Sequence, residues 1–292
     1  MTTKVFRDYD QAALDREYDN RAKVADFADY LARYPRESEK TRAELPCRLD
    51  VRWGPGPAAT LDVFLPGPAA GGRPAPINVF VHGGYWRALD KADFSFVAQG
   101  LVPAGIAVVV VNYPLIPTVD MDALVRHCRE SVAWIHRNAG SFGGDPARLF
   151  VSGHSAGGHL TAMLLATDWP AVAGLPPDTV KGGSGLSGLY DLEPIRLSYL
   201  NETLRLTHDQ ARRNSPVLLP PPRAGSLLLA VGDREGPEYL RQTRDLAAAW
   251  RRAGRPCDVL EMKDQDHFSI VTQLEDPRSE LSRAILRRMG GG

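Results

Sequence analysis

The chain has 292 residues, of which 43% are hydrophobic and 24% are charged, so it can bury the core of one large α/β domain or of two small ones. Its 35 basic and 35 acidic residues give a formal net charge of zero, which argues against a general electrostatic attraction to nucleic acid or to an anionic membrane. Three widely spaced cysteines match neither a disulfide framework nor a zinc motif. The sparse cysteines predict reduced thiols. The charged N-terminus and the absence of an apolar run of bilayer length predict, together with them, a cytoplasmic protein.

The N-terminal part of the chain combines a helical pattern with a hairpin pattern. Apolar residues recur at helical spacing over residues 8–34, and we expect a helical cap segment over residues 1–45. Such a segment either packs on the core as a surface helix pair or borders a binding pocket, and the spacing is compatible with both. Residues 47–53 and 60–65 alternate apolar and polar side chains around a Gly/Pro turn, which predicts a β-hairpin.

Strand and helix patterns alternate along the rest of the chain. Strands are predicted at residues 77–81, 106–111, 148–152, 182–186, 226–231 and 257–261. Helices are predicted at residues 91–101, 122–138, 160–165, 237–252 and 276–288. We therefore predict one α/β domain over residues 1–292, with a mostly parallel central sheet and helices on both faces. Residues 190–222 lack strand signals and are predicted to form a helical lid insertion over the strand ends.

A candidate nucleophile lies where a predicted strand is followed by a predicted helix. The residues Gly153-His154-Ser155-Ala156-Gly157 match the pattern G-x-S-x-G. A serine on such a strained turn projects its hydroxyl above the sheet, and small neighbours relieve the crowding. A chain this rich in glycine has a chance of about one in ten of containing the pattern by accident, so the position between a strand and a helix gives the match its weight. We predict that Ser155 is a catalytic nucleophile.

A serine nucleophile needs a base, and hydrolases that use such a turn place their acid and then their histidine later in the chain. Of the seven histidines, only His208 and His267 follow Ser155 at any distance, and His267 alone lies in a loop after a predicted strand. We predict that His267 is the base.

An acidic residue should orient that histidine from the loop that follows strand 226–231. Asp233, Glu235 and Glu238 are the candidates, and their spacing does not choose among them.

Donors for a developing oxyanion are predicted after strand 77–81, in His82-Gly83-Gly84-Tyr85-Trp86. Glycines allow the backbone N–H groups to approach a substrate oxygen closely, so Gly83 and Gly84 are candidates. The N–H of Ala156, at the start of the helix after the nucleophile, is the third candidate.

Two further patterns bear on cofactor and metal sites. Gly183 to Gly188 match G-x-G-x-x-G, but they overlap a predicted strand and open no helix, so we interpret them as packing glycines. His154 and His159 are five residues apart, which is not the four-residue spacing of a helical zinc motif. We expect neither a cofactor nor a metal.

These motifs resemble the α/β-hydrolase superfamily, in the branch with an H-G-G-x-W loop, and within it the arylformamidase (kynurenine formamidase) group and related bacterial esterases. The matching stretches run in order along nearly the whole chain: 14–18 (LDREY), 82–86 (HGGYW), 112–115 (NYPL), 153–160 (GHSAGGHL), 187–192 (SGLYDL), 236–239 (GPEY) and 266–268 (DHF). The resemblance implies that the residue before the Gly-Pro-Glu-Tyr stretch, Glu235, is the acid. The group usually has Asp at that place, so Asp233 stays the alternative.

Taken together, the sequence predicts a serine hydrolase of a small ester or an N-formyl aryl amide. Ser155 forms the acyl-enzyme, His267 takes and returns the proton, and Glu235 orients His267. The alternative is a non-catalytic small-molecule receptor on the same fold, which would be expected to lack a member of the triad. Tyr85 is the predicted substrate-binding residue, and Trp86, Tyr190 and Phe268 are further candidates for an aromatic pocket lining. The expected partner is a small molecule, and a homodimer is compatible with the sequence.

Overall fold

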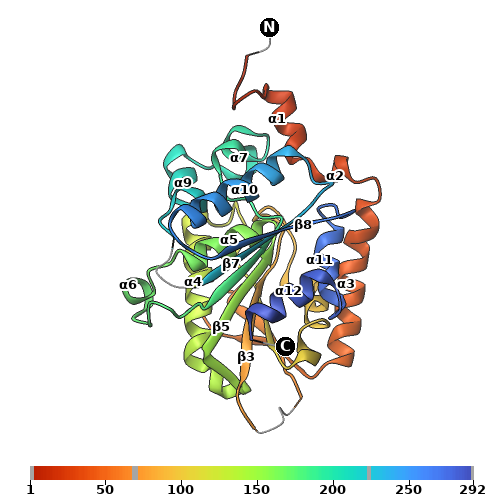
Figure 1. The fold of residues 1–292 in the computed structure, drawn as a ribbon, viewed down its shortest axis with the longest axis vertical. Coiled ribbons are helices and arrows are strands. Elements are labelled where there is room, and N and C mark those ends of the chain that lie inside the picture. Colours follow the sequence, from red (N-terminus) through yellow and green to blue (C-terminus); the bar gives the residue numbers. More distant parts are fainter. Residues whose placement is uncertain (1–2, 68–71, 222–224, 291–292) are drawn as a thin grey trace.

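The computed structural model describes residues 3–67, 72–221 and 225–290, which form an eight-stranded sheet flanked by helices (Figure 1). The strand order is β1-β2-β4-β3-β5-β6-β7-β8. The strands are β1 (Cys47–Arg52), β2 (Thr60–Phe64), β3 (Ala75–Val81), β4 (Ala107–Val111), β5 (Gly144–His154), β6 (Gly182–Leu186), β7 (Ser226–Gly232) and β8 (Cys257–Met262). Strand β2 runs antiparallel to its neighbours β1 and β4, and every other pair is parallel. The predicted hairpin and the mostly parallel sheet are confirmed.

The centre of the sheet is built from strands that are buried on both faces. In β3, Val79 pairs with Val109 of β4 on one side and with Val151 of β5 on the other. Branched aliphatic side chains fit the pleated surface of a sheet that helices cover on both sides. Because these strands are parallel, their carboxyl ends meet at one edge of the sheet, where residues that follow β3, β5, β7 and β8 can converge.

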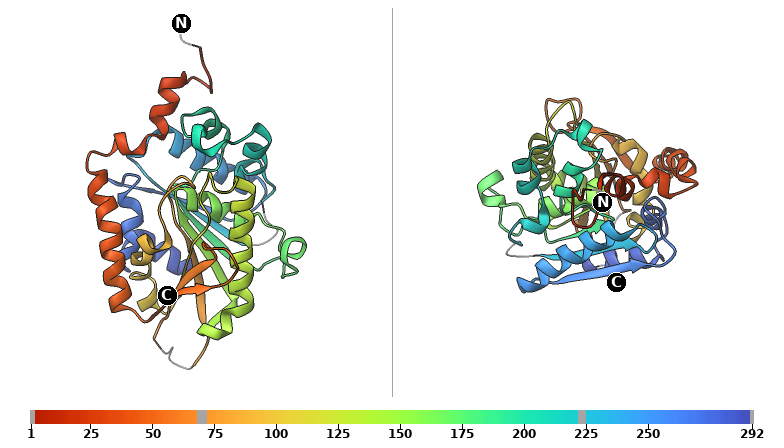
Figure 2. Two further views of the ribbon diagram at one scale, coloured as in Figure 1. Left: turned by 180° about the vertical axis from the view of Figure 1, so that it is seen from behind. Right: turned by 90° about the horizontal axis from the view of Figure 1, so that it is seen from above.

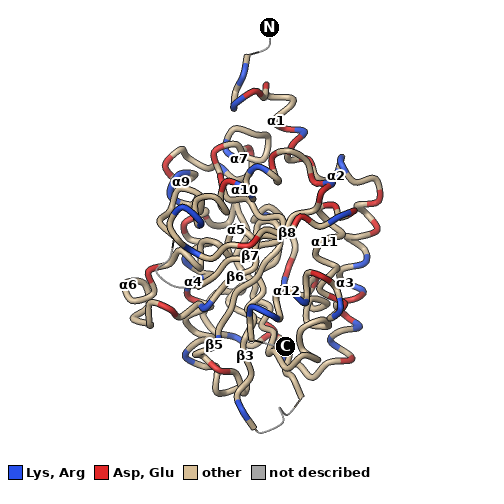
Figure 3. Tube along the Cα trace, viewed as in Figure 1, with Lys and Arg blue, Asp and Glu red and all other residues tan. Residues whose placement is uncertain are grey.

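Helices cover both faces of the sheet, and the two faces have separate apolar cores (Figures 1 and 2). One core packs α4 (Met121–Asn138), α5 (Ala156–Leu165) and α10 (Pro237–Arg252) against the sheet. The other core contains side chains from α3 (Phe27–Glu44) and α12 (Glu280–Arg288). Acidic and basic residues are interspersed along the outer elements, as a zero net charge leads one to expect (Figure 3).

The segment at residues 91–101 differs from its prediction, because it forms a 3₁₀ helix, Lys91–Ala98, instead of an α-helix. Five consecutive residues of it, Phe94 to Ala98, are buried. A short segment that is surrounded on all sides takes its geometry from packing and lacks the one-sided apolar stripe of a surface helix. The helix predicted at 276–288 begins later, at Glu280, with Ser279 as its N-cap.

Two segments lie beyond the carboxyl ends of the strands, at the end of the molecule that carries α1 and α7 in Figure 1. The first comprises α1 (Gln11–Tyr18) and α2 (Asn20–Lys23). Both come before α3 in the chain, and α3 itself packs against the sheet. The second, within residues 190–222, contains α7 (Glu193–Leu197), α8 (Asn201–Leu204) and α9 (His208–Arg213). Residue 222 of that predicted insertion lies outside the described residues. The remaining short helices are α6 (Trp169–Ala173), α11 (Ser269–Thr272) and the 3₁₀ turns Val102–Ala104, Ala139–Phe142, Pro216–Leu218 and Gln273–Glu275.

Candidate active site

Ser155 lies on a sharp turn between β5 and α5. Its backbone has φ 56° and ψ −118°, a conformation that side-chain-bearing residues seldom adopt. The Ser155 N–H donates a hydrogen bond of 2.8 Å to the carbonyl of Leu186, which ties the turn to the end of β6. A Cβ on Gly157 would lie 1.9 Å from the carbonyl oxygen of Val81, so only glycine lets α5 start this close to β3. The small residues predicted around the serine thus have a steric reason.

A hydrogen-bonded relay connects Ser155 to His267 and Glu235. The Oγ of Ser155 lies 3.0 Å from Nε2 of His267, and Nδ1 of His267 lies 2.7 Å from Oε2 of Glu235. The other oxygen of Glu235, Oε1, accepts from the Ser187 hydroxyl at 2.5 Å and from the Gly232 N–H at 2.7 Å. With its carboxylate fixed in this way, Glu235 accepts the Nδ1–H of His267 and leaves Nε2 free to accept the serine proton. All three residues of the relay are buried.

The structure separates the three acids that the sequence proposed. Glu235 contacts His267, whereas the side chain of Asp233 is exposed. Glu238 is buried, but its carboxylate pairs with the guanidinium of Arg241 at 2.7 Å and so is engaged away from the relay. The extra methylene of Glu235 therefore does not prevent the contact with His267.

The other histidines near the turn have structural partners. His154 donates its Nε2–H to the backbone carbonyl of His267 at 2.8 Å, and its burial beside His267 holds its pKa well below the usual value. His159 donates to the carbonyl of Asn214 at 2.7 Å, and burial lowers its pKa to about 4. His208, the other histidine that follows Ser155 at a distance, is exposed at the start of α9.

Two of the three candidate oxyanion donors, Gly83 and Ala156, lie next to the nucleophile. A Cβ on Gly83 would lie 3.2 Å from the Cβ of Ser155, so the backbone of this loop passes directly beside the nucleophile. Gly84 has φ +109°, and a Cβ at this position would overlap the carbonyl of Ala88, so the tight turn at this point requires glycine. Ala156 is the first residue of α5, where the N–H groups at a helix N-terminus favour negative charge.

Two stacked rings stabilise the loop that carries these glycines. The His82 and Tyr113 rings lie 4.1 Å apart at an angle of 11°. The Tyr113 hydroxyl donates to the carbonyl of His82 at 2.9 Å, and the Nδ1–H of His82 donates to the carbonyl of Gly83 at 2.8 Å. Both carbonyls are thus occupied as hydrogen-bond acceptors, which fixes the backbone of the loop beside the nucleophile.

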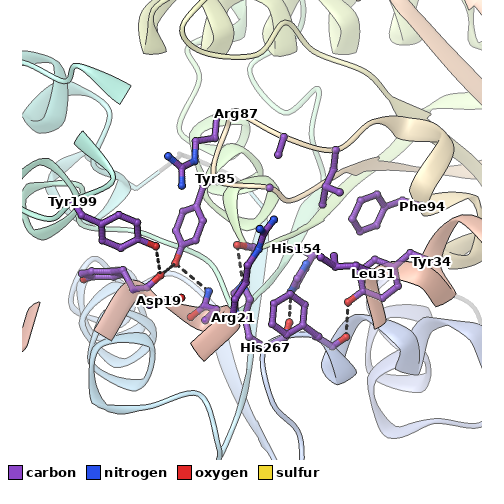
Figure 4. A pocket seen from close by; sticks show the side chains of 17 residues that line it. Asp19, Arg21, Leu31, Tyr34, Tyr85, Arg87, Phe94, His154, Tyr199 and His267 are labelled. Carbon is purple, nitrogen blue, oxygen red and sulfur yellow. Dashed lines mark hydrogen bonds between the residues drawn. The ribbon is translucent and has the colours of Figure 1, made fainter. Parts of the chain in front are cut away.

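A cavity of about 510 Å³ is lined by Ser155 and His267, and Figure 4 shows His267 among the side chains around it. Its lining divides into an apolar side, which includes Leu31, Tyr34 and Phe94, and a polar side, where Asp19, Tyr85, Arg87 and Tyr199 lie. The cavity is lined by Tyr18, Asp19, Asn20, Arg21, Leu31, Tyr34, Gly84, Tyr85, Arg87, Ala88, Leu89, Phe94, His154, Ser155, Tyr199, His267 and Phe268.

The cavity draws on both predicted cap segments. The N-terminal segment supplies Tyr18 to Arg21 and part of α3, and residues 190–222 supply Tyr199. Of the aromatic residues expected around it, Tyr85 and Phe268 line the cavity. Trp86 and Tyr190 do not, because both are fully buried in the core.

Comparison with known proteins identifies the family. The kynurenine formamidase of Danio rerio is 35% identical over 258 residues, which cover 87% of this chain and 85% of the relative. The chain belongs to the kynurenine formamidase family. A family model named BD-FAE also matches residues 61–169. This member of the kynurenine formamidase family is a hydrolase with the α/β-hydrolase fold.

Solved structures show the same fold. A structure from Silicibacter sp. TM1040, of a protein provisionally assigned as a thioesterase, superposes with a TM-score of 0.81 at 32% identity and covers 93% of this chain and 98% of its own. A thermophilic carboxylesterase from a metagenomic library superposes with a TM-score of 0.73 at 17% identity, covering 90% of this chain and 97% of its own, and shows the shared fold. Within the described residues of this family member, no helix combines the length and apolar character needed to cross a bilayer.

Several residues at the site do not stand out in the sequence. Ser187 and Tyr239 occur in stretches that carry the family resemblance. The sequence did not predict that Ser187 contacts Glu235 or that Tyr239 packs beside His267. Asn20 carries no sequence signal, because its partners are 65 and 219 residues away. Contacts at such separations depend on the tertiary fold and not on local pattern.

Proposed function

We propose that this protein hydrolyses the formyl group of an aryl formamide through a covalent formyl-enzyme on Ser155, and that small aryl esters react by the same route. The observation that carries the proposal is the continuous relay from Ser155 Oγ through His267 to Glu235, with Ser155 and His267 in the wall of a cavity. Membership of the kynurenine formamidase family supports the formamide as the preferred substrate.

In the first half of the reaction, Ser155 Oγ attacks the formyl carbon while His267 Nε2 takes the serine proton. Glu235 holds the Nδ1–H and stabilises the imidazolium. The carbonyl oxygen becomes an oxyanion, and we assign its hydrogen bonds to N–H groups of Gly83, Gly84 and Ala156. The C–N bond then breaks as His267 returns its proton to the departing aryl nitrogen, which leaves as a free amine.

In the second half, a water molecule gives one proton to His267 Nε2 and attacks the formyl ester on Ser155. The tetrahedral intermediate collapses, Ser155 Oγ regains the proton from His267, and formic acid leaves and gives its proton to the solvent. His267 therefore acts twice as base and then acid. It returns its proton to the amine in the first half and to Ser155 in the second.

The cavity matches this substrate class in size and character. A volume of about 510 Å³ lies within the range that encloses a small organic ligand. The apolar side, with Leu31, Phe94 and Phe268, supports an aryl leaving group, while the reacting carbon sits above Ser155. The alternative of a non-catalytic receptor is not supported, since receptors of this fold are expected to lack a triad member and the relay here is complete.

The substrate assignment is tested by comparing kcat/KM for N-formylkynurenine, an aryl carbamate and p-nitrophenyl acetate with one enzyme preparation. We expect the formamide to be preferred by at least about tenfold, which corresponds to about 1.4 kcal/mol of differential transition-state binding. A preference for the ester of that size would reject the formamide while leaving the serine mechanism in place.

A further inference from the structure

Asn20 is a buried polar residue that joins two distant parts of the active site. It is the first residue of α2, and only 5% of its surface is exposed. Its side-chain amide donates to the Tyr85 hydroxyl at 3.0 Å and to the Tyr239 hydroxyl at 2.7 Å. Burying an amide costs free energy unless its N–H groups are hydrogen-bonded. These two bonds therefore hold the Tyr85 and Tyr239 hydroxyls in place around Asn20.

The hydroxyls around Asn20 form a closed set of hydrogen bonds. The Tyr85 hydroxyl donates to the backbone carbonyl of Tyr18 at 2.8 Å, and the hydroxyls of Tyr85 and Tyr239 are 2.8 Å apart. Since the Tyr85 proton is directed at Tyr18, the Tyr239 hydroxyl is the donor to Tyr85. Burial raises the pKa of both tyrosines above the usual value, which keeps the hydroxyls protonated.

The two tyrosines hold different parts of the catalytic apparatus. The ring of Tyr239, in α10 directly after the loop of Glu235, lies 4.8 Å from the ring of His267. Tyr85 follows Gly84 in the oxyanion loop and has a positive φ of 47°, which is unfavourable for a residue with a side chain. The link from Asn20 therefore bears on the position of the base and on a strained part of the oxyanion loop.

The segment that carries Asn20 is itself anchored to the loop of the triad acid. Glu17 accepts the N–H of Glu238 at 3.3 Å, and the Tyr18 hydroxyl donates to the Glu238 carboxylate at 2.8 Å. The Lys23 ammonium lies 3.4 Å from the backbone carbonyl of Glu235. Residues before Asn20 thus contact the first turn of α10 and Lys23 after it contacts the loop of Glu235, which fixes α2 relative to the triad.

We propose that Asn20 is a positioning residue, through which the N-terminal segment sets the relative placement of the oxyanion loop and His267. This inference rests on the proposed serine mechanism. It gives the N-terminal segment a part in transition-state stabilisation beyond the wall that it contributes to the cavity.

The test measures kcat and KM of Asn20→Ala with an aryl ester, after titration of active sites with an aryl phosphonate that labels the nucleophilic serine. We expect kcat per active site to fall about 10- to 100-fold with KM within about twofold, since small displacements of reacting groups cost this much. A purely structural role would reduce the titratable fraction and the melting temperature, but would leave kcat per site unchanged.

Asn78→Ala is a matched control. Asn78 is also buried and donates its amide to a hydroxyl, that of Ser152 at 2.8 Å, which lies in β5 and not in the tyrosine pair. We expect a lower melting temperature with kcat per site within about twofold of the wild type. If both variants lower kcat per site equally, the effect of Asn20 is not specific and the proposal fails.

The link through the hydroxyls is tested by introducing Asn20→Ala into a Tyr85→Phe/Tyr239→Phe background. Because the amide then has no hydroxyl to hold, we expect less than about a twofold further loss of kcat per site. A full additional loss, or a rise in KM at constant kcat in the single variant, would overturn the proposal. Should Asn20→Ala not fold, Tyr239→Phe alone must lower kcat per site at constant KM, and an unchanged kcat would refute the link. Wild-type turnover that persists in Ser155→Ala would instead reject the mechanism itself.

Discussion

Replacing Glu235 by glutamine changes the charge of the triad acid while keeping its volume. In the wild type, Oε1 accepts two hydrogen bonds, from Ser187 and from the Gly232 N–H, and Oε2 faces Nδ1 of His267. A backbone N–H can only donate, so the side-chain carbonyl of the introduced glutamine has to stay at the Oε1 position. The amide NH₂ then faces His267.

That orientation fixes the wrong tautomer of the base. An NH₂ group donates, so Nδ1 of His267 must accept and the ring proton moves to Nε2. A protonated Nε2 cannot take the proton from Ser155, which lies 3.0 Å away. Loss of the correct tautomer costs about 10⁴-fold in kcat for an orienting carboxylate in serine hydrolases. We expect a loss of about 10³- to 10⁴-fold for Glu235→Gln, or about 4 to 5.5 kcal/mol in activation free energy.

The assay is kcat with p-nitrophenyl acetate at pH 7.5, normalised to the folded fraction from circular dichroism. Asp233→Asn is the matched control, because Asp233 has the same charge in the same loop but an exposed side chain. We expect it to retain kcat within about twofold, since it removes a solvated charge. Glu235→Asp keeps the charge and the tautomer but shortens the reach, and should lose about 10- to 100-fold. Glu235 is not the residue that orients His267 if Glu235→Gln stays within tenfold of the wild type, or if Asp233→Asn is the variant that loses activity.

Two further predictions concern packing and pH. Gly157→Ala places a Cβ 1.9 Å from the Val81 carbonyl oxygen, so we expect a destabilisation of at least about 3 kcal/mol or failure to fold, measured by urea unfolding; a midpoint equal to the wild type would contradict the steric account. His159 has a folded-state pKa of about 4 against about 6.5 when unfolded, so its contribution to stability is complete above pH 6.5 and is lost as the pH falls toward 4. This contribution to stability is about 3 kcal/mol, as the difference between the two pKa values implies. It is lost because the unfolded chain takes up the proton at a higher pH than the folded protein does. His159→Gln, which can still accept from Trp86 and donate to Asn214, should therefore lose less stability than the wild type between pH 6.5 and 4.5, and an equal loss would show that His159 does not titrate as described.

The sequence was sufficient for the fold where local pattern and burial agree. The strand at Gly182–Leu186 has the predicted bounds, and its glycines are explained by packing, since a Cβ on Gly183 would lie 2.4 Å from the side chain of Leu165. The sequence pattern was insufficient where packing decides the local structure, as in the 3₁₀ helix at Lys91–Ala98. The ammonium of Lys91 in this helix is buried against the carboxylate of Asp62.

The candidate site follows the same division. Ser155 and His267 could be proposed because each follows a strand whose carboxyl end lies at the same edge of the sheet. The choice between Asp233 and Glu235 depends on which side chain turns inward, and the residues alone left this open until the family resemblance favoured Glu235. The contact of Asn20 with Tyr239 spans 219 residues and depends on where the N-terminal segment docks, which no local pattern encodes.

Mass spectrometry of the enzyme quenched during turnover of p-nitrophenyl acetate shows directly whether Ser155 becomes acylated. We expect an acetyl group on the peptide that contains Ser155, formed at the rate of the p-nitrophenol burst and absent from Ser155→Ala, which should also lose all hydrolysis above background. Undiminished turnover by Ser155→Ala, or a kinetically competent acetyl group on another residue, would contradict the serine mechanism.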